Sequence, residues 1–227
     1  MKVIIYDFDG TLTPYPMVRY KILEKCNVGY DEMEILVHDY MRTYNKNIYE
    51  SYYTVFFDIL NKHNIDINLD NICYGSDIIE YSKGVIDYFN KYKDIKHYVV
   101  TSGLKDFIIN SYVNKYLDDV YGVTVNYEEK KTDKLLTDKE KVLAIKKIIE
   151  INKCSISDVV YIGDGLTDKY AFSYIHNNGG KTIFINDKDN DNLYLELNKD
   201  NIIDYRFNRD YSIDSDIDRF ISEFVEL

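Results

Sequence analysis

The chain has 227 residues, of which 45% are hydrophobic, and this composition suits one globular domain or one domain with an insert. Its formal net charge of −11 argues against nonspecific nucleic-acid binding, which depends on Lys and Arg side chains that neutralise phosphates. No apolar run approaches about 18 residues, so we expect no membrane span.

In chain order, short runs of β-branched and aromatic residues predict buried strands at 3–6, 97–101 and 159–162. Weaker strand candidates are 120–125, 182–185 and 202–205. Apolar residues at helical spacing predict helices over 106–117 and 139–151, the second with Thr137-Asp138 as its N-cap. The polar segment 185–201 is expected to be a surface loop with a short helix or strand. This alternation indicates an α/β fold with a mostly parallel sheet.

A block of helical patterns interrupts the alternation after the first strand. The stretches with helical spacing are 18–26, 31–44 and 49–63. Pro14 and Pro16 mark the start of the block, because proline cannot continue a strand or helix without losing a hydrogen bond. We therefore expect a catalytic core made of residues 1–13 and 84–227, and an inserted all-helical lobe made of residues 14–83.

Carboxylates follow two of the strong strands directly. Asp7 and Asp9 come after the first strand, and two residues of this spacing share a face if the strand continues through them. Asp164 ends the third strong strand, and Asp168 follows four residues later. Parallel α/β sheets bind ligands at the carboxyl ends of their strands, so we expect these acids to meet there. Oxygen-only ligands of this kind suit Mg²⁺.

The remaining strong strand ends in groups suited to phosphate. Thr101 and Ser102 bring hydroxyls to the same edge, and Gly103 allows backbone N–H groups to approach an anion closely. The helix that follows favours a phosphate through its N-terminal dipole. Lys139 and Lys141, at the start of a later helix, offer a cation.

Four motifs together resemble the haloacid dehalogenase (HAD) superfamily. They are DFDGT (Asp7–Thr11), TSG (Thr101–Gly103), a lysine that opens a helix, and GDGLTD (Gly163–Asp168), in the order of the family. The resemblance covers residues 1–13 and roughly 84–185. The helical insert after the first motif resembles the C1 cap of the phosphoserine-phosphatase-like branch.

The resemblance implies a Rossmann-like core in which Asp7 is the nucleophile and Asp9 the general acid/base. Mg²⁺ would be held by Asp7, the Asp9 carbonyl and Asp164, while Asp168 would orient the groups around the metal. Ser102, Gly103 and Lys139 would bind the phosphoryl group. Lys139 is favoured over Lys141 because Val142, three residues beyond Lys139, begins the buried face of the helix; Lys141 stays the alternative.

The function expected from these residues is a Mg²⁺-dependent phosphatase that hydrolyses a small phosphorylated metabolite, a monoester, through an aspartyl-phosphate. The alternatives are a phosphotransferase or mutase on the same fold and a receiver-like signalling phospho-acceptor. Dehalogenation is disfavoured because it does not need the acid/base group that Asp9 supplies. The stretch Thr13–Pro16 has no glutamate to grip a substrate amine, and Gly10 replaces the serine frequent in that branch, so phosphoserine is disfavoured.

Three cysteines, few and odd in number, favour a reducing compartment with free thiols. The first residues acquire charge too early for a secretion signal. The expected location is therefore the cytoplasm.

Overall fold

The structure, a computed structural model, describes residues 1–17, 21–186 and 191–226. In these ranges one seven-stranded sheet has the order β4-β3-β2-β1-β5-β6-β7, and every neighbouring pair is parallel except β3 and β4. The strands are β1 (Val3–Tyr6), β2 (Lys96–Leu104), β3 (Asp119–Asn126), β4 (Lys131–Lys134), β5 (Val159–Gly163), β6 (Lys181–Ile185) and β7 (Tyr205–Phe207). The predicted α/β fold with a mostly parallel sheet is thereby confirmed.

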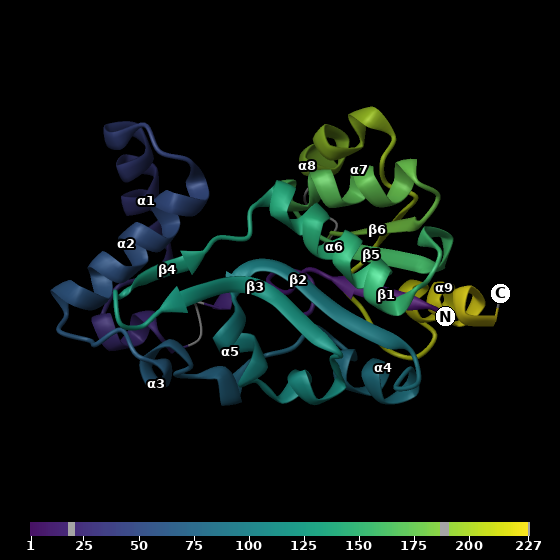
Figure 1. The fold of residues 1–227 in the computed structure, drawn as a ribbon, viewed down its shortest axis with the longest axis horizontal. Helices are drawn as coiled ribbons and strands as arrows, with labels where there is room; N and C mark the ends of the chain where they lie inside the picture. The colour runs from purple at the N-terminus through teal and green to yellow at the C-terminus, as the bar shows by residue number, and fades with distance from the viewer. Residues whose placement is uncertain (18–20, 187–190, 227) are drawn as a thin grey trace.

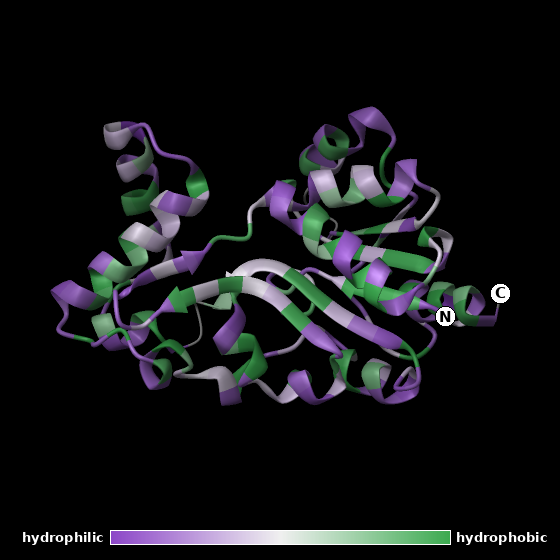
Figure 2. Cartoon of the chain, viewed as in Figure 1, coloured by the Kyte–Doolittle hydropathy of each residue, from purple (hydrophilic) through white to green (hydrophobic). Residues whose placement is uncertain are grey.

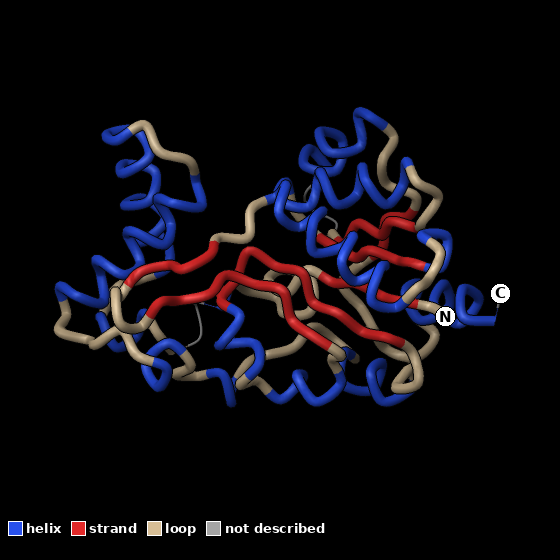
Figure 3. The backbone as a smooth tube through the Cα atoms, viewed as in Figure 1, coloured by secondary structure: helices blue, strands red, loops and turns tan. Residues whose placement is uncertain are grey.

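Helices cover both faces of this sheet (Figures 1 and 3). They are α4 (Val85–Lys91), α5 (Lys105–Ile109), α6 (Asp138–Asn152), α7 (Lys169–Asn177), α8 (Asp191–Leu197) and α9 (Asp216–Glu226). In Figure 1, α6 and α7 lie on one side and α4 and α5 on the other. The central strands are strongly hydrophobic in Figure 2, as expected for strands that helices bury on both faces. No helix in the described ranges is long and apolar enough to cross a membrane.

The segment after β1 is helical, as its patterns predict. It contains α1 (Tyr30–Tyr44), α2 (Ile48–Lys62) and α3 (Leu69–Ile72), together with the short 3₁₀ turns η2 (Leu23–Cys26) and η3 (Ser76–Ile78). These elements form a separate group at one end of the molecule (Figure 1). The predicted helix 18–26 is confirmed only as the turn η2, and residues 18–20 lie outside the described ranges.

The helical segment leaves the core and returns to it at one point. The Ser82 backbone N–H donates to the Leu12 carbonyl at 2.9 Å, and the Ser82 hydroxyl donates to the Thr11 carbonyl at 3.0 Å. The predicted boundaries at 13 and 84 lie within two residues of these bonds. The division into a core and an inserted lobe stays a prediction.

A hairpin that the sequence analysis missed extends the sheet toward the helical segment. β3 and β4 pair antiparallel, and the hairpin reaches α2 (Figure 1). Its turn residue Lys130 forms an ion pair with Asp66, at 2.6 Å from Nζ to Oδ1. β4 was not predicted because its sequence, KTDK, is polar throughout and carries no apolar alternation.

Two predicted elements differ from the structure. The helix expected over 106–117 is divided into α5 and the 3₁₀ turn η4 (Tyr112–Tyr116). The Asn110 side chain donates to the Asp106 carbonyl, and the Ser111 hydroxyl donates to the Ile108 carbonyl, which satisfies backbone acceptors outside a continuing helix. The strand expected over 202–205 lies instead at β7. In the polar segment 185–201, the expected short helix is α8, and residues 187–190 lie outside the described ranges.

A buried polar chain crosses the core between β1, β2 and α4. His97 Nε2 lies 2.8 Å from the Tyr92 carbonyl, which can only accept, so Nε2 carries the ring proton. Nδ1 then accepts from the Tyr6 hydroxyl at 3.0 Å, and the Tyr6 oxygen accepts from the Tyr88 hydroxyl at 2.9 Å. Burial lowers the pKa of His97 to about 4, so the folded protein holds this ring neutral.

This ring predicts a loss of stability in mild acid. An unfolded histidine has a pKa near 6.5, so the unfolded chain binds more protons than the folded one between about pH 6.5 and 4, and stability falls as the pH is lowered. We expect protonation of His97 in the unfolded chain to lower the free energy of unfolding by about 2 kcal/mol when the pH is lowered from 7 to 5. Denaturant unfolding of the wild type and of His97→Gln at the two pH values measures the difference. The exposed His38→Gln serves as control, and equal pH dependence in all three proteins would contradict the prediction.

Candidate active site

The carboxyl ends of three adjacent strands bring the predicted motifs together. β1 lies between β2 and β5 in the sheet. Asp7 and Asp164 directly follow β1 and β5, and Thr101 lies in the C-terminal half of β2. The turn after β1 depends on Gly10, which has a φ of +77°, and a Cβ there would lie 2.0 Å from Asp164 Oδ2. Glycine at this position therefore allows the Asp164 carboxylate to lie against the first motif.

Lys141 is the cation at the centre of the site. Its side chain is fully buried, and Nζ lies 2.7 Å from Asp168 Oδ1 and 3.1 Å from Asp7 Oδ1. Burial opposes the charge of Lys141, but the two carboxylates raise its pKa above the ordinary value. The ammonium is therefore charged and shared between two acids from different strands.

The choice of Lys139 over Lys141 is corrected by the structure. Lys139 is exposed, and its Nζ lies 6.0 Å from the centre of the Tyr170 ring. The residues that α6 buries are Lys141, Ala144, Ile145, Ile148 and Asn152. The buried face thus begins at Lys141. The other buried residues follow it at helical spacings of three, four, seven and eleven residues, and this spacing could have identified Lys141 from the sequence.

Asp168 supports the other groups of the site. Its Oδ1 accepts from Lys141 and, at 2.6 Å, from the Tyr161 hydroxyl. Its Oδ2 accepts from the backbone N–H groups of Asp164 and Gly165, both at 3.1 Å. Both oxygens are occupied, so Asp168 positions Lys141 and the Asp164 loop. Its role in orienting the groups around a metal stays a prediction.

The two acids of the first motif differ in proton affinity. Burial raises the pKa of Asp7 to about 6, against the opposing effect of the Lys141 ammonium. Burial and the charge of Asp7 raise the pKa of Asp9 to about 8, although the Met17 backbone N–H donates to Asp9 Oδ1 at 2.8 Å. At neutral pH, Asp7 is therefore ionised while Asp9 retains its proton.

The acids fit a divalent cation. Carboxylate oxygens of Asp7, Asp164 and Asp168 lie within 4.8 Å of one another. Asp7 Oδ1 is buried and has no hydrogen-bond donor, because Lys141 lies at ion-pair distance but not in hydrogen-bond geometry. This oxygen therefore keeps lone pairs that accept no hydrogen bond, beside the Lys141 ammonium. Since Asp168 is occupied by its donors, Asp7 and Asp164 are the side chains suited to bind the ion.

Ser102 and Gly103 lie beside these acids, as predicted. The Ser102 hydroxyl donates to the Leu136 carbonyl at 2.9 Å, and the Ser102 carbonyl accepts from the Tyr53 hydroxyl of α2 at 2.6 Å. A Cβ on Gly103 would lie 2.2 Å from Met17 Cε and 3.2 Å from Asp9 Oδ2, so the backbone approaches closely here. The contact from Tyr53 was not anticipated, and it joins the helical segment to the site.

One cavity of about 300 Å³ brings five of the predicted residues together. They are Asp7, Asp9, Ser102, Gly103 and Asp164. Residues from α1, α2 and the loop after the first motif add apolar and aromatic side chains to the lining. Asp168 lies behind this surface, fully buried, and Lys139 lies away from it.

Comparison with known proteins yields structural matches. No profile of a known protein family and no curated protein matches this sequence. A phosphoserine phosphatase, solved as an analogue of its phospho-aspartyl intermediate, has a TM-score of 0.68 at 20% identity, over 98% of both chains. A HAD family hydrolase from Salmonella enterica subsp. enterica serovar Typhi scores 0.65 at 14% identity, over 95% of this chain and 72% of that one. L-2-haloacid dehalogenase from Xanthobacter autotrophicus scores 0.56 at 11% identity, over 98% of both chains.

The fold and the arrangement of acids define the class of protein. The chain has the fold of HAD family hydrolases, and its similarity to phosphoserine phosphatases extends over nearly its whole length. The resemblance drawn from the four motifs is thereby confirmed for the fold.

The site predicts opposite outcomes for two neighbouring lysines. Lys141→Met leaves two buried carboxylates without their cation, and we expect a loss of about 3–5 kcal/mol in unfolding free energy. Lys139→Met, the matched control, removes an exposed charge and should change stability by less than about 0.5 kcal/mol. Denaturant unfolding of both variants measures the difference.

A second substitution tests the cause of that loss. In Asp7→Asn/Lys141→Met one of the two buried charges is also removed, so part of the stability should return. Equal stability of the two single lysine variants, or no recovery in the double variant, would show that this ion pair is not what holds the site.

Proposed function

We propose that this protein is a metal-dependent phosphatase that hydrolyses a small phosphate monoester through an aspartyl-phosphate on Asp7. The observation that carries the proposal is that Asp7 and Asp9 share one cavity with Ser102, Gly103 and Asp164, with the Lys141 ammonium 3.1 Å from Asp7 Oδ1. Asp7, with a pKa of about 6, is ionised and can attack, whereas Asp9, with a pKa of about 8, is protonated and can donate. Environments that separate the pKa values of two nearby acids assign them to base and acid roles.

In the first step, a carboxylate oxygen of Asp7 attacks phosphorus, and the bond between phosphorus and the ester oxygen breaks. The departing oxygen takes the proton of Asp9, so the alcohol leaves neutral. Lys141 remains beside Asp7 and offsets charge next to the phosphoryl group. Ser102 and the backbone at Gly103, which line the same cavity, are suited to contact the phosphoryl oxygens.

In the second step, Asp9 accepts a proton from a water molecule that attacks phosphorus. The bond between phosphorus and Asp7 breaks, which releases inorganic phosphate and restores the carboxylate. Asp9 thus ends the cycle protonated, as it began. Half-buried at the cavity wall and bonded to the Met17 N–H, it is held in place for both proton transfers.

The cation proposed for this site is Mg²⁺. Asp7, Asp164 and the Asp9 carbonyl would hold it, and carboxylate and carbonyl oxygens are the ligands that Mg²⁺ prefers. When bound, it supplies positive charge that offsets the charge of the phosphoryl oxygens. The proximity of the Asp7, Asp164 and Asp168 carboxylate oxygens to one another supports this assignment.

The structural neighbours support phosphoryl chemistry, although they include both phosphoserine phosphatases and a haloacid dehalogenase. Dehalogenation releases a halide, which needs no proton from the protein. Asp9 holds a proton beside the nucleophile, so its position favours the release of an alcohol. We further propose that residues 14–83 act as a cap, because side chains from this segment line the same cavity as the acids.

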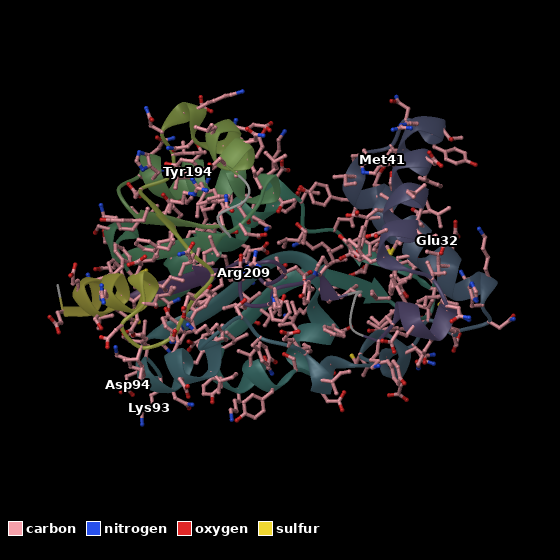
Figure 4. All side chains as sticks on the ribbon, turned by 180° about the vertical axis from the view of Figure 1, so that it is seen from behind. Glu32, Met41, Lys93, Asp94, Tyr194 and Arg209 are labelled. Carbon is pink, nitrogen blue, oxygen red and sulfur yellow. The ribbon has the colours of Figure 1, made fainter. Side chains whose placement is uncertain are left out.

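Asp7→Asn is expected to abolish hydrolysis while the protein stays folded. The amide has the shape of the carboxylate but cannot attack phosphorus, and Lys141 keeps Asp168 as its partner. Release of phosphate from a generic aryl phosphate, measured beside thermal melting, checks the prediction. Asp94→Asn, on an exposed turn far from the site (Figure 4), should keep full activity. Activity of Asp7→Asn at even a tenth of the wild-type rate excludes Asp7 as nucleophile.

Mg²⁺ is expected to raise the melting temperature, because an ion that binds the folded state stabilises it according to its concentration and affinity. Asp164→Asn should lose this rise, since one of the proposed ligands is removed. Asp214→Asn, which changes an acid in a separate surface group, should keep it. A melting curve with and without Mg²⁺ needs no turnover. An equal rise in wild type and Asp164→Asn would place the ion elsewhere.

A further inference from the structure

The wall of the cavity that faces the acids is built from rings. Its lining residues from residues 14–83 are Pro16, Met17, Tyr30, Ile48, Tyr49, Tyr52, Tyr53 and Phe56. Five of these eight are aromatic. Tyr53 and Phe56 are buried, whereas Tyr49 and Tyr52 are partly exposed in the cavity.

Contacts among these rings hold the wall in place. Tyr52 and Tyr53 meet edge to face, with ring centres 5.3 Å apart, and Phe56 packs on Phe57 at 5.4 Å. The Tyr53 hydroxyl is bonded to the Ser102 carbonyl of the core at 2.6 Å. The wall is therefore positioned directly against the phosphate-binding motif, and its rings present preformed apolar surface.

The acidic groups of the cavity all belong to the core. Among the lining residues that the structure describes, the acidic side chains are Asp7, Asp9 and Asp164, and those from residues 14–83 are uncharged. In-line attack places the leaving group on the side of phosphorus away from the nucleophile. With the phosphoryl group at Asp7, the leaving group extends from the acids toward the ring wall.

The cavity has room for a phosphoryl group and one ring. Its volume of about 300 Å³ is roughly twice that of an engineered cavity of about 150 Å³ that binds benzene.

We propose that the substrate is a phosphate monoester whose leaving group carries one flat, uncharged, largely apolar ring. This inference rests on the proposed phosphatase function and adds the class of substrate. Tyr49 and Tyr52 contact the ring and determine specificity, because they are the two tyrosines of α2 that remain partly exposed in the cavity. A zwitterionic or polyhydroxylated leaving group would face apolar rings and lose its hydration without compensation.

Three probes with similar ester bonds test the substrate class. Benzyl phosphate, glucose 6-phosphate and O-phosphoserine are all primary alkyl phosphates, so their leaving groups differ mainly in ring, polarity and charge. We expect kcat/KM for benzyl phosphate to exceed the other two at least tenfold, chiefly through a lower KM. Equal values, or a preference for the sugar or the amino acid, overturn the inference while the phosphatase function stands.

Substitutions of tyrosines that line the cavity test whether these side chains cause the preference for a ring. Tyr49→Ala and Tyr52→Ala should each raise KM for benzyl phosphate about tenfold, and should lower the ratio of kcat/KM for benzyl phosphate to that for O-phosphoserine. Tyr44→Ala, which removes an exposed tyrosine of α1 outside the cavity, is the matched control and should change neither. If Tyr44→Ala and the wall variants behave alike, the wall does not select the substrate.

Binding without turnover separates the two proposals. Benzylphosphonate, which cannot be hydrolysed, should raise the melting temperature of the wild type in the presence of Mg²⁺ more than 2-amino-3-phosphonopropionate does. Tyr49→Ala should reduce this effect. If these shifts are observed but the wild type hydrolyses none of the phosphate esters, the binding site for a ring is supported and the proposed phosphatase activity is refuted. Equal shifts with the two phosphonates refute the ring site.

Discussion

The Lys141 ammonium, buried between Asp7 and Asp168, is the interaction on which the site depends. A buried charge is costly unless it is paired, and here one cation pairs with carboxylates that follow two different strands. Asp168 in turn holds the backbone of the Asp164 loop. The first motif, the last motif and helix α6 are thereby joined through a single ammonium group, and the position of Asp7 is set by packing of the core.

This arrangement explains how two acids of one short motif can take opposite roles. Asp7 lies beside the ammonium and Asp9 lies two residues further along, beside the helical segment and the Met17 N–H. Both are buried enough for their pKa values to rise, but only Asp7 has a close cation to limit the rise. The difference between the two acids therefore comes from their immediate surroundings within one short motif.

The strands and the acids could be predicted because buried parallel strands are short and apolar, and their carboxyl ends meet. The boundaries of β1 and the positions of Asp7 and Asp164 follow from that rule alone. Lys139 was chosen over Lys141 because the buried face of α6 was assigned from its apolar residues, and a buried lysine does not count among them. The β3–β4 hairpin and the break after α5 depend on tertiary contacts and side-chain hydrogen bonds that hydrophobic periodicity does not record.

The hydrogen bonds between Ser82 and the Leu12 and Thr11 carbonyls determine how easily the inserted segment can change during evolution. These bonds hold the two ends of the segment 13–81 together, so with respect to the sheet the segment is one closed loop. The entropy of closing a loop grows only with the logarithm of its length, at about 0.6 kcal/mol for each doubling. Helices can therefore be lengthened, lost or exchanged between these two points at small thermodynamic cost to the sheet. Selection can then change the molecule that is recognised while the acids and the lysine stay where they are.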